Sequence, residues 1–263
     1  MNYSHFETLT KTSGACVIDP TWTQGRSAFG GLTAALVLAY IESQADLAGR
    51  DLLTININFC GPAIAGETCE FRHKILSQGK SVMQVEGQLI QDGEVKTQIV
   101  TCFGMQRFSN IQLTPALKVF PEKSIQVPFM SGLMPEFVQH LDVKYTSKHM
   151  PFSGSKAAQV SGWVRLSESP DVFCDGALVT LIDAWPPAIL PMLEQVAPSS
   201  SITWNIEFLH PRKQLGADDY IYYECEAVQA VAGYAHSEAK IYDQEGRLIA
   251  LSRQLVGVYE KKK

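Results

Sequence analysis

Apolar and polar positions along the chain form two long apolar runs, each followed by shorter runs with strand-like alternation. Residues 31–44 are apolar almost all round, which is typical of a helix enclosed by other structure. A second apolar run covers residues 177–190, but it contains Pro186 and Pro187. Two prolines should kink or end that helix just after Asp183. The pattern therefore predicts one enclosed helix in each half of the chain.

Strand-like segments follow each apolar run and would wrap the helices. They cover residues 52–60, 68–76, 81–91 and 95–103 in the first half, and residues 200–209, 220–228, 234–242 and 247–258 in the second. A further strand is expected before each helix, around residues 7–19 and 158–167. Each half is thus expected to contain one helix and an antiparallel sheet of five strands.

The same order of elements occurs twice because the sequence itself is repeated. Residues 56–62 read Asn-Ile-Asn-Phe-Cys-Gly-Pro and residues 205–211 read Asn-Ile-Glu-Phe-Leu-His-Pro, a shift of 149 positions (205 − 56). This period is too long for a solenoid and indicates a duplicated domain. We expect an N-terminal repeat over residues 1–105, a proline-rich crossover connection over residues 106–155 and a C-terminal repeat over residues 156–263.

Alignment of the two repeats shows polar residues in the second where the first has mostly apolar ones. Asp183 corresponds to Leu38, Ser201 to Leu52 and Gln254 to Thr101. A carboxylate within an apolar helix is costly unless a polar group meets it. We interpret the polar set as a functional site. The structural alternative is that Asp183 accepts hydrogen bonds from the amides of its own broken helix.

The composition narrows the class of protein. The net charge of −5 is modest and, apart from Lys261 to Lys263, the basic residues are scattered, which does not favour nucleic-acid binding. Residues 32–41, the longest uncharged apolar stretch, reach about half of the roughly 20 residues that span a bilayer, and the N-terminus lacks a secretory pattern. The six cysteines form no CxxC pair. We expect a cytoplasmic protein without membrane contact, metal or other cofactor.

Several motifs, taken in order, resemble the acyl-CoA thioesterase II family and its thioesterase-like relatives. They are Ala-Phe-Gly-Gly at 28–31, Asn-Phe-Cys-Gly-Pro at 58–62, Leu-Ile-Asp at 181–183, Phe-Leu-His-Pro at 208–211 and the segment 243–254. The resemblance implies an α+β double hotdog, in which two fused repeats each wrap a curved antiparallel sheet around a long central helix. It also implies an acyl-CoA substrate and, because such sheets have edges to cover, a homo-oligomer.

The same resemblance implies roles for individual residues. In the family, an Asp on the second helix, a Thr or Ser on the next strand and a Gln on the last strand hold a water against the thioester carbonyl. The pattern falls on Asp183, Ser201 and Gln254. Thr203 is the alternative hydroxyl, because two residues along a strand return to the same face. Backbone amides of Gly30 and Gly31, at a helix start, are the natural partners of an oxyanion. One composite site per chain is expected.

Other chemistry stays open at this point. A catalytically silent acyl-thioester binding protein would share the fold, although the three polar positions favour an enzyme. A hotdog hydratase or dehydratase would need an Asp and His pair, and no His follows Asp183 in its helix. Attack by Asp183 itself, through a covalent acyl intermediate, is an alternative to attack by water. The acyl chain length is undetermined, and the aromatic residues that could line its cavity are Phe29, Phe59, Trp163, Trp185 and Trp204.

Overall fold

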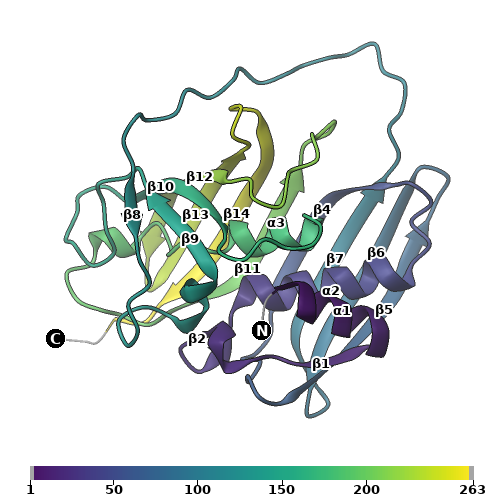
Figure 1. The fold of residues 1–263 in the computed structure, drawn as a ribbon, viewed down its shortest axis with the longest axis horizontal. Helices are drawn as coiled ribbons and strands as arrows, with labels where there is room; N and C mark the ends of the chain where they lie inside the picture. The colour runs from purple at the N-terminus through teal and green to yellow at the C-terminus, as the bar shows by residue number, and fades with distance from the viewer. Residues whose placement is uncertain (1–2, 261–263) are drawn as a thin grey trace.

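The computed structural model describes residues 3–260 and contains one twelve-stranded antiparallel sheet that curves around two helices (Figure 1). The strand order is β1-β5-β6-β7-β4-β11-β14-β13-β12-β10-β9-β8. These strands are β1 (Ala15–Val17), β4 (Asp51–Phe59), β5 (Thr68–Gln78), β6 (Val82–Gln91), β7 (Glu94–Gly104), β8 (Ile125–Val127), β9 (Leu141–Tyr145), β10 (Gln159–Leu166), β11 (Ser199–Phe208), β12 (Ile221–Val231), β13 (Tyr234–Tyr242) and β14 (Leu248–Val258). A separate hairpin pairs β2 (Thr23–Gln24) with β3 (Ser27–Ala28).

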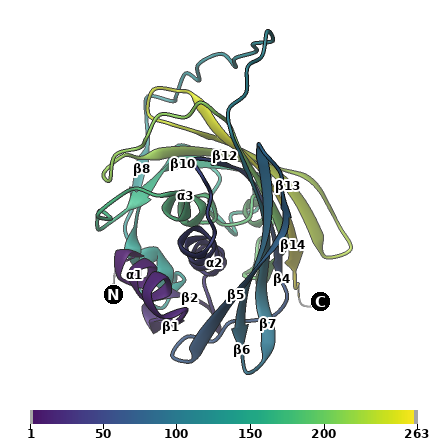
Figure 2. The same ribbon diagram turned by 90° about the vertical axis from the view of Figure 1, so that its right-hand side faces the viewer.

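The enclosed helix of the first half is α2 (Gly30–Gln44), and most of its residues are buried on every side, as the apolar run predicts. Figure 2 shows α2 and α3 (Asp175–Ile182) together inside the curve of the sheet. The second helix is much shorter than the long central helix that was expected. Its regular turns end at Asp183, because Pro186 and Pro187 cannot continue the hydrogen-bonding pattern. The expectation of a long helix in each repeat is therefore wrong for the second.

The strand expected at residues 7–19 is also wrong for most of its length. Residues Tyr3–Ser13 form helix α1, and only β1 joins the sheet. A Glu7–Lys11 ion pair of 2.7 Å, spaced as on one helix face, supports the helix. The corresponding strand of the second half, expected at residues 158–167, is present as β10.

The two halves join through β4 and β11, the strands that carry the repeated motif. Asn56 pairs directly with Asn205, its own counterpart at the shift of 149, and the Asn205 amide donates a hydrogen bond of 2.8 Å to Asn56. Because equivalent residues face each other on antiparallel strands, an approximate twofold axis passes between them. The axis relates α2 to α3. The start of α2 lies beside Asp183 at the end of α3, and the start of α3 at Gly176 lies beside Ala35 of α2.

The connection between the halves is only partly irregular. Residues 105–124 form no helix or strand, but β8, a 3₁₀ helix (η2, Glu136–His140) and β9 follow within the range that was expected to be a connection. Strand β9 buries every second residue, as expected of a strand with one face on the core; the buried residues are Leu141, Val143 and Tyr145. The prolines on either side of it had favoured an irregular connection instead. None of the described helices has an apolar stretch long enough to cross a membrane.

Candidate active site

Three polar side chains from separate elements converge inside the second half of the sheet. Asp183 is the residue that ends α3, Ser201 lies near the start of β11 and Gln254 lies on β14. The Gln254 side-chain amide donates one hydrogen bond of 2.9 Å to Asp183 Oδ1 and another of 2.8 Å to Ser201 Oγ. An amide nitrogen has two hydrogens, so both are used and the three groups form one network.

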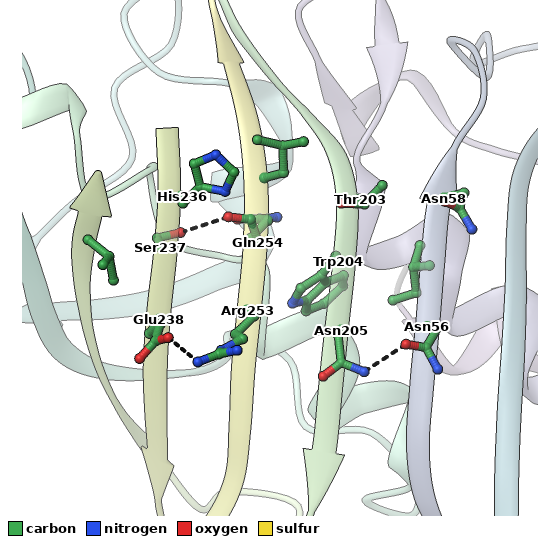
Figure 3. A pocket seen from close by; sticks show the side chains of 13 residues that line it. Asn56, Asn58, Thr203, Trp204, Asn205, His236, Ser237, Glu238, Arg253 and Gln254 are labelled. Carbon is green, nitrogen blue, oxygen red and sulfur yellow. Dashed lines mark hydrogen bonds and ion pairs between the residues drawn. The ribbon is translucent and has the colours of Figure 1, made fainter. Parts of the chain in front are cut away.

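A bulge in β11 decides which hydroxyl joins this network. Opposite β14, Ser201 pairs with Val256 and Thr203 with Leu255, so one extra residue is accommodated between them. Ser201 therefore points inward with buried Val256, whereas Thr203 is exposed on the outer face beside Asn58. A groove on the outer face of the sheet is lined by Thr203, Asn58 and Asn205 among others, as Figure 3 shows. The expectation that Ser201 and Thr203 share a face is wrong, and Thr203 lies outside the network.

Burial determines the acidity of Asp183. Its helix neighbours Val179 and Leu181 are fully buried, and Asp183 as a whole residue is half-buried. Desolvation of the charged form raises the pKa of the Asp183 carboxyl from 3.8 to about 7, while hydrogen bonds from the Gln254 side chain and the Gly31 backbone act in the opposite direction. The two donors belong to β14 and α2, so Asp183 does not simply cap its own helix. A carboxyl of this pKa can exchange a proton near neutrality.

The start of α2 lies directly against this carboxyl. A Cβ atom at Gly31 would be 2.8 Å from Asp183 Cβ and 2.7 Å from the ring of Phe29, and a Cβ at Gly30 would be 3.1 Å from Asp183 Oδ2. Only glycine allows so close an approach. The glycine turn of the first half and the Asp183 helix of the second half thus form one composite site. The Gly31 N–H is engaged by Asp183, whereas no backbone partner of the Gly30 N–H is found among residues 3–260.

The side chain of Trp185, two residues after Asp183, lies in an aromatic slot formed by Tyr145, Gly162 and Tyr223, which was not identified from the sequence. Gly162 on β10 lies between Tyr145 on β9 and Tyr223 on β12, and the three residues are direct neighbours across the strands. The Trp185 ring lies over Gly162, where a Cβ would be 2.5 Å from it, stacks on Tyr223 at 5.6 Å and meets Tyr145 edge-on at 5.1 Å. Trp185 follows Asp183 by two residues, so this slot fixes the end of α3. A glycine within a strand was the available signal.

The other aromatic candidates differ in their positions. Phe59 and Phe29 contact the Gly30-Gly31 turn, with Phe29 stacked on Phe137 at 3.9 Å. Trp204 is buried and donates to Ser252 at 2.8 Å. Trp163 packs against Phe120 of the connection instead of facing the site. Among residues 3–260, no group of three potential ligands lies close enough to hold a metal ion.

Comparisons with solved structures place the chain in the hotdog fold. A hotdog-fold protein of unknown function from Alicyclobacillus acidocaldarius is 21% identical, with a TM-score of 0.81 over 94% of this chain and 93% of that one. An acyl-CoA thioesterase II from Mycobacterium marinum is 18% identical, with a TM-score of 0.71 over 90% of this chain and 92% of the other. A search of curated proteins found no match. At these identities the structures show the shared fold alone.

Family models carry the comparison further. The model of the acyl-CoA thioesterase N-terminal domain matches residues 18–104, and the model of the C-terminal domain matches residues 121–258. The first range contains the Gly30-Gly31 turn, and the second contains Asp183, Ser201 and Gln254. The C-terminal match alone covers more than half of the 263 residues. The chain therefore belongs to the acyl-CoA thioesterase family.

Proposed function

We propose that this thioester hydrolase, built as a double hotdog, cleaves a fatty acyl-CoA to the free acid and CoA by attack of a water molecule that Asp183 activates. The single observation that supports the proposal most is the Gln254 amide, which joins Asp183 and Ser201 in one network beside the glycine turn. The site has a proton acceptor, an orienting hydroxyl and backbone donors. These groups can supply what catalysed thioester hydrolysis needs, which is an oriented nucleophile, a proton acceptor and stabilisation of the oxyanion.

The hydrogen-bond directions suggest how the water would be held. Ser201 Oγ accepts a hydrogen from Gln254, so the Ser201 hydroxyl hydrogen is available to another acceptor. Asp183 Oδ1 accepts from Gln254, and Oδ2 faces the Gly30 position. A water between the Ser201 hydroxyl and the Asp183 carboxylate would receive one hydrogen bond and donate another. This leaves an oxygen lone pair for attack on the thioester carbon.

In the proposed reaction the water proton moves to Asp183 as the water oxygen bonds to the carbonyl carbon. The carbonyl oxygen becomes negatively charged and is stabilised by the Gly30 N–H at the positive end of the α2 dipole. Collapse of this intermediate breaks the carbon–sulfur bond. The departing thiolate of CoA takes the proton back from Asp183, which restores the carboxylate. A pKa near 7 suits both transfers, because the group can accept and return a proton at neutral pH.

The proposal is tested with a panel of acyl-CoA esters from acetyl to palmitoyl, with thiol release as the readout. We expect hydrolysis by the wild-type chain and at least a hundredfold lower kcat in Asp183→Asn, the scale for loss of a general base. Tight acyl-CoA binding without hydrolysis at any chain length would instead indicate a binding protein. Addition of water to crotonyl-CoA, followed by absorbance, would indicate a hydratase.

A second experiment separates attack by water from attack by Asp183 itself. A single turnover in heavy-oxygen water, followed by mass spectrometry of the protein, reports the path. Activation of water puts the label only in the released acid. Label in the Asp183 carboxyl would show that a covalent acyl-enzyme was formed and then hydrolysed, and would replace the mechanism above.

A further inference from the structure

One segment of the connection between the halves contacts both parts of the composite site. We call η2 and β9 together, residues 136–145, the brace. Near its start, Phe137 packs against Phe29, which directly precedes the glycine turn. At its end, Tyr145 packs against Trp185 in the aromatic slot. The brace is therefore placed to fix the two parts of the site against each other.

Helix η2 presents two rings on one side. In a 3₁₀ helix, with three residues per turn, side chains at positions i and i+3 lie above one another, as Phe137 and His140 do. The Phe137 ring stacks on Phe29, with centroids 3.9 Å apart and planes 3° apart. The His140 ring stacks on Trp22, at 4.1 Å and 7°. Two stacks side by side fix both the position and the tilt of η2 on the segment that leads into α2.

A chain of hydrogen bonds supports the stack of His140. Asp19 Oδ1 accepts from the Thr21 N–H at 2.9 Å and from the Thr21 hydroxyl at 2.7 Å. The hydroxyl has only one hydrogen, so His140 Nε2, which lies 3.0 Å from Thr21 Oγ1, is the donor of that contact. Burial lowers the pKa of His140, so the ring is neutral near pH 7 and carries its hydrogen on Nε2.

Phe29 carries this arrangement to the glycine turn. Its N–H donates to the Trp22 carbonyl at 2.9 Å, and its ring is covered by Phe137. The ring also reaches Gly31, where a Cβ would be 2.7 Å from Phe29 and 2.8 Å from Asp183 Cβ. A small shift of Phe29 would therefore move Gly31 relative to Asp183, and with it the backbone N–H that Asp183 accepts.

The corresponding helix start of the second repeat is built differently. Gly176 corresponds to Gly31 (176 − 31 = 145), so Cys174 stands in the position of Phe29. A cysteine has no ring to stack. Of the two helix starts, the one that faces Asp183 has the aromatic clamp, which connects the clamp with the site.

We propose that the brace is a positioning element of the active site and that it holds the Gly30-Gly31 turn at the working distance from Asp183. Phe137 and His140 act through that turn and not on the substrate, so they are positioning residues. The inference rests on the proposed hydrolysis, because it concerns the same site. A misplacement of about 1 Å can cost about a hundredfold in rate, so a loosened brace should lower kcat. It should leave KM nearly unchanged, because ground-state binding of the substrate is not its task.

The test compares Phe137→Leu and His140→Ala with the matched control Phe120→Leu. Phe120 is an aromatic residue of the same connection, but it packs on Trp163 and Tyr222 away from the site. In thiol-release assays, both brace variants should lower kcat at least about tenfold, with KM within about twofold of the wild type. Phe120→Leu should keep the wild-type kcat, even if its Tm falls. His140 is only half-buried, so His140→Ala decides the outcome if Phe137→Leu does not fold.

Kinetics alone can overturn the proposal in two ways. The first is a wild-type kcat in the brace variants. The second is an equal loss of kcat in Phe120→Leu, because the effect would then be one of general packing.

A second measurement needs no turnover. Carbon NMR of the aspartate carboxyls follows the titration of Asp183, whose signal is assigned by its loss in Asp183→Asn. Burial raises the pKa of Asp183 and the hydrogen bond from the Gly31 backbone opposes this, so a loosened turn should raise that pKa by about 0.5 or more in both brace variants. Phe120→Leu should leave it unchanged. An unchanged Asp183 pKa in both brace variants would overturn the proposal even if kcat fell. A wild-type chain that hydrolyses no acyl-CoA would refute the proposed function, and this titration would still decide about the brace.

Discussion

Replacement of Asp183 by Asn should lower kcat at least about a hundredfold and, at alkaline pH, make the protein more stable. The carboxyl has a pKa of about 7 in the folded chain and 3.8 as an unperturbed group. Folding is therefore most favoured when the group is protonated, below about pH 4. This contribution to stability is lost progressively as the pH rises from 4 to 7, and it stays lost above 7. Asn has the same shape but does not ionise.

The size of the effect follows from the two pKa values. Each pH unit between them removes about 1.4 kcal/mol of unfolding free energy. Between about pH 5 and pH 8 the wild type should lose roughly 2.5 kcal/mol through this group alone, whereas Asp183→Asn should not. The partial exposure of Asp183 makes this an upper bound. For a chain of this length, the difference corresponds to roughly 5–8 °C in Tm.

The assay is a thermal melt of both proteins across this pH range, with the difference in Tm as the readout. Asp183→Asn should gain stability over the wild type as pH rises, and most of the gain should appear between pH 5 and pH 8. Asp46→Asn is a control, because its parent is an exposed aspartate outside the site. An equal Tm difference at pH 5 and pH 8 would refute the assignment of a raised pKa to Asp183.

Three further predictions concern the rate of hydrolysis. In thiol-release assays, Gln254→Ala should lower kcat at least about a hundredfold and Ser201→Ala about tenfold or more. Thr203→Ala should match the wild type, and an effect equal to that of Ser201→Ala would contradict the position that the bulge gives to Thr203. The kcat/KM of the wild type should rise with pH through about 7, since the Asp183 base must be ionised; a flat profile from pH 5 to pH 9 would exclude it. Gly31→Ala should lower kcat at least about a hundredfold, because the added Cβ would displace Asp183. Gly61→Ala is the control and should be neutral, because a Cβ there would be 3.5 Å from the Lys96 side chain, an ordinary contact. Equal rates for the two variants would show that the close approach of Gly31 to Asp183 is unimportant.

Much of the fold follows from local patterns in the sequence. The enclosed helix α2 is evident because its residues are apolar on every side, and the early end of α3 is evident from Pro186 and Pro187. The repeated motif at residues 56–62 and 205–211 indicates the duplication, and the structure pairs its two copies across β4 and β11. Comparison of the repeats also selects Asp183, Ser201 and Gln254, which the structure brings into one network.

Features that depend on distant contacts were not evident. The bulge that turns Thr203 outward is visible only once β14 is paired, since the strand pattern alone implies strict alternation. The slot for Trp185 requires three neighbouring strands to place Gly162 between two tyrosines. Helix α1 occupies residues where a strand was expected, although Glu7 and Lys11 are spaced as on one face of a helix. Strands β8 and β9 were not predicted because the connection is rich in proline and because both are stabilised by pairing with other strands of the sheet.

The most direct test of the central claim is the kcat of the Asp183→Asn/Gln254→Ala double variant, compared with each single variant. If one hydrogen-bonded network activates the nucleophile, the double variant should be about as slow as Asp183→Asn alone, because Gln254 acts only through that network. Independent effects that multiply in the double variant would contradict the account, and so would thiol release by Asp183→Asn at the wild-type rate.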